Sequence, residues 1–201
     1  TESPAVDAII ELLAPRLEAL RAAAEAGDAD LALEAAAKVR ILCAHRRGAP
    51  GVSEWNRIAT GLLRGRTATN DPWFAGRLVL ITRNDARLGL SNGDTGVVVA
   101  TSEGPRVAFR RAGELVLFDP VQLEEVETAF AMTVHKSQGS EFPTVVLVLP
   151  PGGSLLVGRE LCYTGITRAR TEWLVVGDPD VVQEPVATPS IRMTGLAARL
   201  S

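Results

Sequence analysis

This chain contains little cysteine and histidine. Its only cysteines, Cys43 and Cys162, each lie within an apolar stretch, and free cysteine is among the residue types most often buried. We therefore expect two free thiols rather than a disulfide, and with them a cytoplasmic setting. Two histidines and two cysteines, widely separated, provide no metal-ligand spacing, so the sequence predicts no metal site.

Long apolar runs are also missing. Runs such as VVLVL at 145–149 are far too short to cross a bilayer, and the first ten residues, TESPAVDAII, lack the charged and apolar regions of a signal peptide. We expect no membrane partner. The 201 residues, 46% of them hydrophobic, suffice for one large domain or for one domain that carries a smaller one.

A phosphate-binding loop of the Walker A type is absent as well. Such a loop requires a Gly-Lys pair, and the two lysines, Lys38 and Lys136, follow alanine and histidine. The run LVVGD at 174–178 resembles a Walker B strand. Without a Walker A loop upstream, we interpret it as an ordinary strand end.

Acidic and basic residues are unevenly distributed, although the net charge is only −3. Residues 40–111 contain twelve arginines and five acids, whereas residues 1–39 and 112–201 each carry a net charge of −5. Arginine pairs with phosphate through a planar fork, so this basic middle favours a phosphate-facing surface. Alternatively, it reflects only a preference for arginine over lysine, since arginine supplies 19 of the 21 basic residues.

The first third of the chain predicts an α/β layer. Apolar residues recur at helical spacing over residues 4–40, and GDAD at 27–30 divides the pattern into two helices, with Asp28 or Asp30 as N-cap. A short apolar strand at 39–44 and a Gly- and Pro-containing loop follow. We expect the next helix at 53–63, with Ser53 as its N-cap.

From Gly76 the pattern changes to short β runs that turn residues separate, Asn92-Gly93 among them. The predicted strands lie at 77–83, 96–102, 105–111 and 114–120. Such closely spaced strands indicate a small barrel inserted in the chain. The α/β pattern then resumes: we expect a buried strand at 144–150, a helix at about 158–169, a strand at 172–178 and a loop with a short helical end from Pro179.

Two stretches are candidates for a functional site: AMTVHKSQGSEF at 131–142 and ELCYTGITRAR at 160–170. Arg168 has no acidic neighbour, so beside a nucleotide it could act as an arginine finger, but a solvated arginine is the simpler interpretation. The alternative for His135 is a structural histidine in a tight turn. Glu141 could be an ordinary turn acid.

The motifs resemble those of superfamily 1 DNA helicases. The first stretch, continuing through PTVVLVLP, is similar to helicase motif V, and the second is similar to motif VI. ILCAHRRGAPGVSEWN at 41–56 resembles the motif IV region. RNDARLGLSNGDTG at 83–96 resembles the barrel that the RecD branch inserts, and the tail IRMTGLA resembles the end of that branch. The resemblance covers about residue 20 to the C-terminus.

This resemblance implies a fold: an α/β, RecA-like second motor domain with an inserted small SH3-like β-barrel. Residues 1–70 and 128–201 would form the motor domain, and residues 71–127 the barrel. Motifs I to III, with the Walker A loop, would precede Thr1.

The resemblance also implies roles for individual residues. Contacts to the DNA backbone would come from Thr133, His135, Lys136 and Ser137. Gln138 and Gly139 would lie near the nucleotide, and Glu141 would accept a hydrogen bond from the ATP ribose. Arg168 and Arg46 would both reach the γ-phosphate.

The activity implied is that of a 5′ to 3′ DNA helicase, driven by ATP with Mg²⁺, in the alpha subunit of exodeoxyribonuclease V, acting in double-strand break repair. Its partners would be single-stranded DNA, an N-terminal motor domain that also supplies the Mg²⁺ ligands, and the beta and gamma subunits. This stretch alone would be inactive. The alternative is a non-catalytic DNA-binding or docking module with a borrowed helicase fold.

Overall fold

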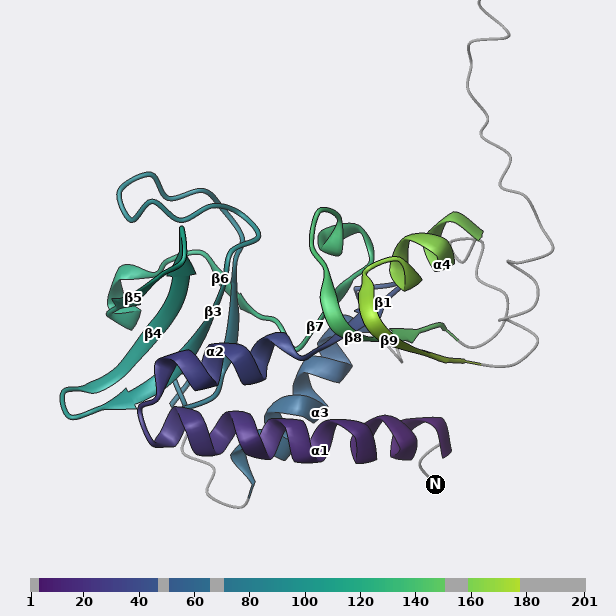
Figure 1. Ribbon diagram of the computed structural model, residues 1–201, viewed down its shortest axis with the longest axis horizontal. Coiled ribbons are helices and arrows are strands. Elements are labelled where there is room, and N and C mark those ends of the chain that lie inside the picture. Colours follow the sequence, from purple (N-terminus) through teal and green to yellow (C-terminus); the bar gives the residue numbers. More distant parts are fainter. Residues whose placement is uncertain (1–3, 47–50, 66–70, 151–158, 178–201) are drawn as a thin grey trace, which may run out of the picture.

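The computed structural model describes residues 4–46, 51–65, 71–150 and 159–177, which form two sheets and the helices that pack on them (Figure 1). The predicted loop after Arg46, the domain boundary at residue 70 and the tail from Pro179 lie wholly or partly outside these residues. The α/β class is confirmed, with one parallel and one antiparallel sheet.

The parallel sheet has the strand order β7-β1-β8-β9. Its strands are β1 (Val39–Cys43), β7 (Ala131–Thr133), β8 (Phe142–Val148) and β9 (Ala169–Val176). The central strands β1 and β8 are almost wholly buried, which explains why they appear in the sequence as largely apolar runs rather than alternating ones, apart from the buried Arg40 of β1. Helix α3 (Val52–Arg64) packs on β7 and β1, and α4 (Arg159–Ile166) packs on β8 and β9.

The antiparallel sheet has the order β5-β4-β3-β2-β6. It consists of β2 (Leu78–Ile81), β3 (Thr95–Thr101), β4 (Gly104–Arg111), β5 (Glu114–Phe118) and β6 (Val126–Thr128), with a 3₁₀ turn, η1 (Pro120–Gln122), before β6. One face buries an apolar cluster in which the rings of Phe109 and Phe118 meet edge to face, 5.8 Å apart. Among these described strands no pairing joins β5 to β6, so closure into an SH3-like barrel stays a prediction.

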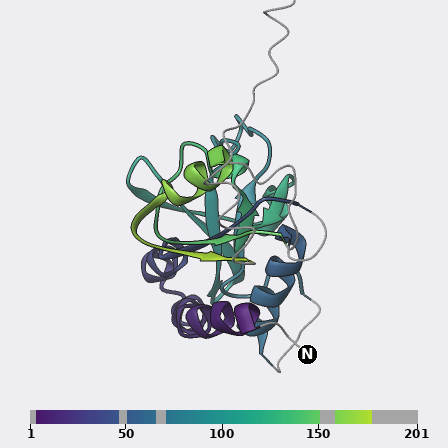
Figure 2. The ribbon, with the colours of Figure 1, turned by 90° about the vertical axis from the view of Figure 1, so that its right-hand side faces the viewer.

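Helices α1 (Pro4–Glu25) and α2 (Ala29–Ala37) pack against each other and against β3, and α1 also contacts α3 (Figures 1 and 2). The turn between α1 and α2 contains Gly27 at φ +74°, where a Cβ atom would lie 2.8 Å from the carbonyl oxygen of Ala100 in β3. Only glycine fits there without displacing the strand. Asp28 then caps α2 by accepting a hydrogen bond from the backbone N–H of Leu31, as one of the two predicted caps.

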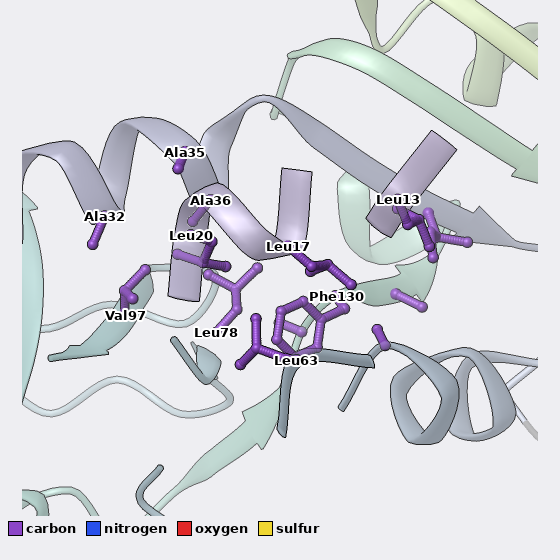
Figure 3. Packing of buried hydrophobic residues seen from close by; sticks show 14 of the residues in the cluster. Leu13, Leu17, Leu20, Ala32, Ala35, Ala36, Leu63, Leu78, Val97 and Phe130 are labelled. Carbon is purple, nitrogen blue, oxygen red and sulfur yellow. The ribbon is translucent and has the colours of Figure 1, made fainter. Parts of the chain in front are cut away.

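A single apolar cluster joins the two sheets. Figure 3 shows leucines of α1, alanines of α2, Leu63 of α3 and Phe130 around Leu78 and Val97 of the antiparallel sheet. Buried residues of the parallel sheet, such as Ile41 and Val146, belong to the same cluster. The antiparallel sheet therefore shares a core with the rest of the chain.

Several local expectations differ from the structure. Gly51, not Ser53, is the N-cap of α3, and the Ser53 hydroxyl instead donates to the carbonyl oxygen of Arg46. Asn92-Gly93 lies within the longer connection between β2 and β3 and does not form a two-residue hairpin loop. The three-residue strands β6 and β7 were not predicted, since so short a run carries no periodicity.

Candidate functional site

The stretch 131–142 begins with strand β7 and continues into a 3₁₀ turn, η2 (His135–Ser137). The Thr133 hydroxyl accepts a hydrogen bond from the backbone N–H of Lys136, at 3.3 Å. The Ser137 hydroxyl donates to the carbonyl oxygen of Val134, at 2.7 Å, and Ser137 is wholly buried. Thr133 and Ser137 therefore fix the turn from within, and a DNA contact by the Ser137 hydroxyl would require the turn to open.

Strand β7 is an edge strand, and a side chain of α3 covers its free edge. The Asn56 amide nitrogen donates to the carbonyl oxygen of Ala131, at 3.1 Å, and its amide oxygen accepts from the Ala131 N–H, at 2.8 Å. Asn56 thus takes the place of a neighbouring strand. It lies at the end of the stretch similar to motif IV and positions the start of the stretch similar to motif V.

The other predicted residues of this loop point outward. His135, Lys136, Gln138, Gly139 and Glu141 are all exposed. Gly139 has φ +84°, a left-handed conformation that favours glycine, although a Cβ atom there would meet nothing within 4 Å. The backbone conformation, and not a lack of space, is therefore the reason for glycine at this position.

An ionic cluster forms where β1 and β7 end. One carboxylate oxygen of Glu127 accepts a hydrogen bond from Arg46 Nη2, and the other accepts from Lys136 Nζ at 2.9 Å. Partial burial alone would raise the pKa of Glu127, but the hydrogen bonds and positive charges of Lys136 and Arg46 outweigh it and lower this pKa. Sequence analysis did not identify Glu127.

A small cavity of about 170 Å³ adjoins this cluster. Its polar lining includes Arg46, Glu127, Thr133 and Lys136, and Val52, Leu80 and Met132 are among its apolar residues. The structure thus brings together one predicted γ-phosphate residue and two predicted DNA contacts.

Two further predicted residues, Glu141 and Arg168, lie at the opposite end of the parallel sheet. Glu141 precedes β8 and forms an ion pair with Arg170, with Oε2 and Nε 2.9 Å apart. Arg168 precedes β9, and its guanidinium donates to the carbonyl oxygens of Thr164, at 3.2 Å, and Ser140, at 3.4 Å. The Arg168 side chain therefore contacts the loop that carries Glu141.

The strand register separates Arg46 from Arg168. Cys43, the last residue of β1, is level with Val148 of β8, whereas Ala169 of β9 is level with Phe142, six positions earlier in β8. At a rise of about 3.3 Å per residue, these levels are about 20 Å apart. These levels describe the backbone at the two strand ends, and a γ-phosphate shared by Arg46 and Arg168 stays a prediction.

Residues 128–176 match the family described as UvrD-like helicase C-terminal domain, so this part of the chain is similar to the C-terminal domain of a helicase. Over nearly its whole length, the chain is similar to RecD. It is 44% identical over 197 residues to the RecBCD enzyme subunit RecD of Mycolicibacterium smegmatis, covering 97% of this chain and 35% of the relative. With the same subunit of Mycobacterium tuberculosis H37Rv it shares 42% identity, covering 94% and 33%.

The resemblance to the C-terminal part of RecD that the motifs predicted is thereby confirmed. The chain spans about a third of the length of these relatives. It is also 30% identical to the ATP-dependent RecD2 DNA helicase of Deinococcus radiodurans, covering 81% of this chain and 23% of the relative. Among solved structures it is similar to Pif1 helicase at forked double-stranded DNA, with 16% identity, 94% and 50% coverage and a TM-score of 0.48.

No helix among the described residues is both long and apolar enough to span a bilayer.

Proposed function

We propose that this chain is the second motor domain of an ATP-dependent 5′ to 3′ DNA helicase of the RecD type. The observation that supports it is the path of the loop from Thr133 to Glu141. At the carboxyl end of the parallel sheet the loop begins close to Arg46 and carries Lys136. At the amino end it finishes beside Arg168 and Arg170. One short loop thus links two groups of cations, each suited to phosphate.

The carboxyl end is the proposed DNA side. His135 and Lys136 are exposed there, and Thr133 and Arg46 line the adjoining cavity. Contacts to the phosphate backbone allow a strand to slide without regard to sequence. In this proposal Ser137 supports the DNA contacts by fixing the turn, and Arg46 extends from the same cavity to the γ-phosphate of ATP.

The amino end is the proposed nucleotide side. Glu141 would accept from the ATP ribose, and the exposed Gln138 and Gly139 would lie near the phosphates. Arg168 would leave its carbonyl partners to reach the γ-phosphate. The Mg²⁺ ligands and the Walker A loop are assigned to an N-terminal motor domain, as the resemblance implies.

On this proposal, residues 1–70 and 128–201 form the motor domain and residues 71–127 an inserted SH3-like barrel. The name of the RecD relatives, RecBCD enzyme subunit, supports a place in the same kind of complex, with the beta and gamma subunits of exodeoxyribonuclease V as partners. A cytoplasmic role in double-strand break repair and recombination follows from that placement. ATP binding closes the cleft between the two motor domains, and the loop passes this movement to the DNA side.

The test compares His135→Ala with Glu141→Ala in the full-length protein, with single-stranded DNA affinity and ATP affinity measured separately. His135→Ala should weaken DNA binding about fivefold for any sequence, the equivalent of one net hydrogen bond of about 1 kcal/mol, and should reduce DNA-stimulated ATP turnover further. Glu141→Ala should weaken ATP binding and spare DNA binding.

Glu114→Ala, an exposed acid on β5, is the matched control and should change neither affinity. The alternative of a non-catalytic docking module predicts no DNA-stimulated ATP turnover in the full-length wild-type protein. If both loop variants behave like the control, the loop is a structural turn and the proposal is wrong.

A further inference from the structure

One positive charge is buried in the parallel sheet. Arg40, the second residue of β1, is 2% exposed, and no ion pair joins it to a carboxylate of the described residues. Its Nε atom has no hydrogen-bond partner among them. Burial lowers the pKa of the guanidinium to about 10, because the charged form is kept out of water. A buried charge without a counter-charge lowers stability, so stability does not account for arginine at this position.

The two contacts of Arg40 lie at the two ends of one segment. Its Nη1 donates to the carbonyl oxygen of Ala129, at 2.5 Å. Its guanidinium carbon lies 4.9 Å from the ring centre of Phe142, which is a cation–π contact. Ala129 precedes β7 and Phe142 begins β8, so the chain between them is the loop with the predicted DNA and nucleotide contacts. Arg40 thus joins the two ends of that loop at its base.

Ala129 is also the point where the chain passes from one sheet to the other. Its N–H donates to the carbonyl oxygen of Leu78 in β2, at 3.0 Å, while its carbonyl oxygen accepts from Arg40 of β1. The next carbonyl oxygen, that of Phe130, accepts from the N–H of Ile41 in β1, at 3.2 Å. The antiparallel sheet therefore holds one side of this crossing, and β1 holds the other. Any displacement of Ala129 is passed to the start of β7.

We propose that Arg40 is a positioning residue for the helicase reaction: it ties the crossing between the two sheets to the start of β8, and so holds the loop from Thr133 to Glu141 in the shape that links DNA binding to ATP turnover. This rests on the proposed function, which assigns DNA contacts to one end of the loop and the nucleotide to the other. Arg40 itself is buried and acts only through the backbone and the ring that it contacts.

The test is Arg40→Met in the full-length protein, which keeps much of the side-chain volume and removes the charge. The melting temperature should stay close to that of wild type, because removal of a buried unpaired charge offsets the lost hydrogen bond. The ratio of DNA-stimulated to basal ATP turnover should fall about tenfold or more, since a displacement of about 1 Å can cost about a hundredfold. Arg40→Lys keeps the charge and can still donate to the Ala129 carbonyl oxygen, so it should restore part of that ratio.

Hydrogen exchange follows the loop itself. Amide exchange, measured peptide by peptide without DNA or ATP, should be faster over β7 and η2 in Arg40→Met than in wild type, and unchanged over α1 and β4. Wild-type exchange over β7 and η2 would overturn the proposal. Faster exchange in all these peptides together with a lower melting temperature would make Arg40 an ordinary core residue and would overturn it as well.

Arg64→Met is the matched control. The guanidinium carbon of Arg64 lies 4.8 Å from the ring centre of Phe74, and its Nη2 donates to the carbonyl oxygen of Asp71, so the kinds of contact are the same. Neither partner belongs to the loop. The control should therefore keep the wild-type turnover ratio and the wild-type exchange of β7 and η2.

An equal fall of the turnover ratio in Arg40→Met and Arg64→Met would contradict the positioning role, and so would a wild-type ratio in Arg40→Met. If Arg40→Met does not fold, Arg40→Lys decides. A reduced ratio at an unchanged melting temperature supports the proposal, and a wild-type ratio overturns it.

The result also separates this inference from the proposed function. If DNA stimulates ATP turnover in the wild-type protein and equally in Arg40→Met, the positioning role fails and the helicase function stands. If DNA does not stimulate the wild-type protein, both fail.

Discussion

The two cysteines differ in how burial affects their ionisation. Cys43 is fully buried in β1, and burial raises the pKa of its thiol from 9.0 to about 12, while burial also raises the pKa of the half-buried Cys162 thiol. Between about pH 9 and 12, the folded chain keeps a proton on Cys43 that the unfolded chain releases. Folding therefore loses stability as pH rises through this window.

We predict that the melting temperature falls more between pH 8 and pH 10.5 in the wild-type protein than in Cys43→Ala. Both proteins would be compared by thermal unfolding at each pH. Cys162→Ala, which removes a thiol that is only half-buried, should reduce the pH dependence less than Cys43→Ala does. An equal fall in wild type and Cys43→Ala would show that other groups dominate in this range.

For single residues, the sequence identifies site residues that belong to a motif with their neighbours in the chain. It misses site residues whose contacts are to residues far away in the sequence. Thr133, His135, Lys136 and Glu141 belong to one stretch, so a pattern marks them together. Glu127 pairs with Lys136 nine residues away and with Arg46 81 residues away, and no local pattern encodes that meeting. The common phosphate expected for Arg46 and Arg168 stays a prediction, because the register places only their backbones.

Among the elements, edge strand β7 depends on one side chain of α3. Asn56 satisfies both backbone groups of Ala131, so its removal leaves a donor and an acceptor without partners in a half-buried place. We predict that Asn56→Ala lowers the free energy of unfolding by about 2 kcal/mol and weakens single-stranded DNA binding. Denaturant unfolding and DNA titration measure the two effects.

Asn56→Asp is the informative companion variant. A carboxylate can still accept from the Ala131 N–H but cannot donate to its carbonyl oxygen. The expected loss lies between wild type and Asn56→Ala. An unchanged free energy of unfolding in both variants would mean that β7 keeps its position without the two hydrogen bonds from Asn56.

The longer helices and strands could be predicted from the sequence because burial of one face, or of the whole strand, leaves a hydrophobic pattern over many consecutive residues. Strands β1, β3, β4 and β8 and helices α1 to α3 each have enough residues for burial to impose a period or a continuous apolar run. Strands β6 and β7 have three residues each, and their pairing with β2 and β1 determines them instead. The N-cap of α3 differs from the predicted one for a similar reason. The Ser53 hydroxyl donates its hydrogen bond to the carbonyl oxygen of Arg46 in the preceding loop instead of capping the helix.

At the scale of the whole molecule, the shared apolar cluster predicts that the two sheets lose structure together. Leu78 of β2 is 3% exposed and belongs to the same cluster as Ile41 and Cys43 of β1. Leu78→Ala should cost about 2–5 kcal/mol, as core truncations do. It should also speed alkylation of Cys43 in the parallel sheet, followed peptide by peptide in the full-length protein under mild denaturant.

Leu117→Ala, at a position 46% exposed on β5, provides the control and should leave the alkylation rate of Cys43 unchanged. Unchanged alkylation of Cys43 in Leu78→Ala would show that the antiparallel sheet opens independently, as an autonomous inserted barrel would.

The packing of helices α1 and α2 also determines how fast the ion pairs of Glu127 can rearrange. Because both helices pack on β3 and α1 contacts α3 as well, the two sheets are fastened to each other, and Glu127 cannot leave Arg46 and Lys136 by a swing of one sheet. Only side-chain rotation remains, and exposed side chains rotate within picoseconds to nanoseconds, whereas domain movements take microseconds or longer. The ion pairs of Glu127 with Arg46 and Lys136 therefore open and re-form many times during one domain movement of the kind that ATP binding would drive.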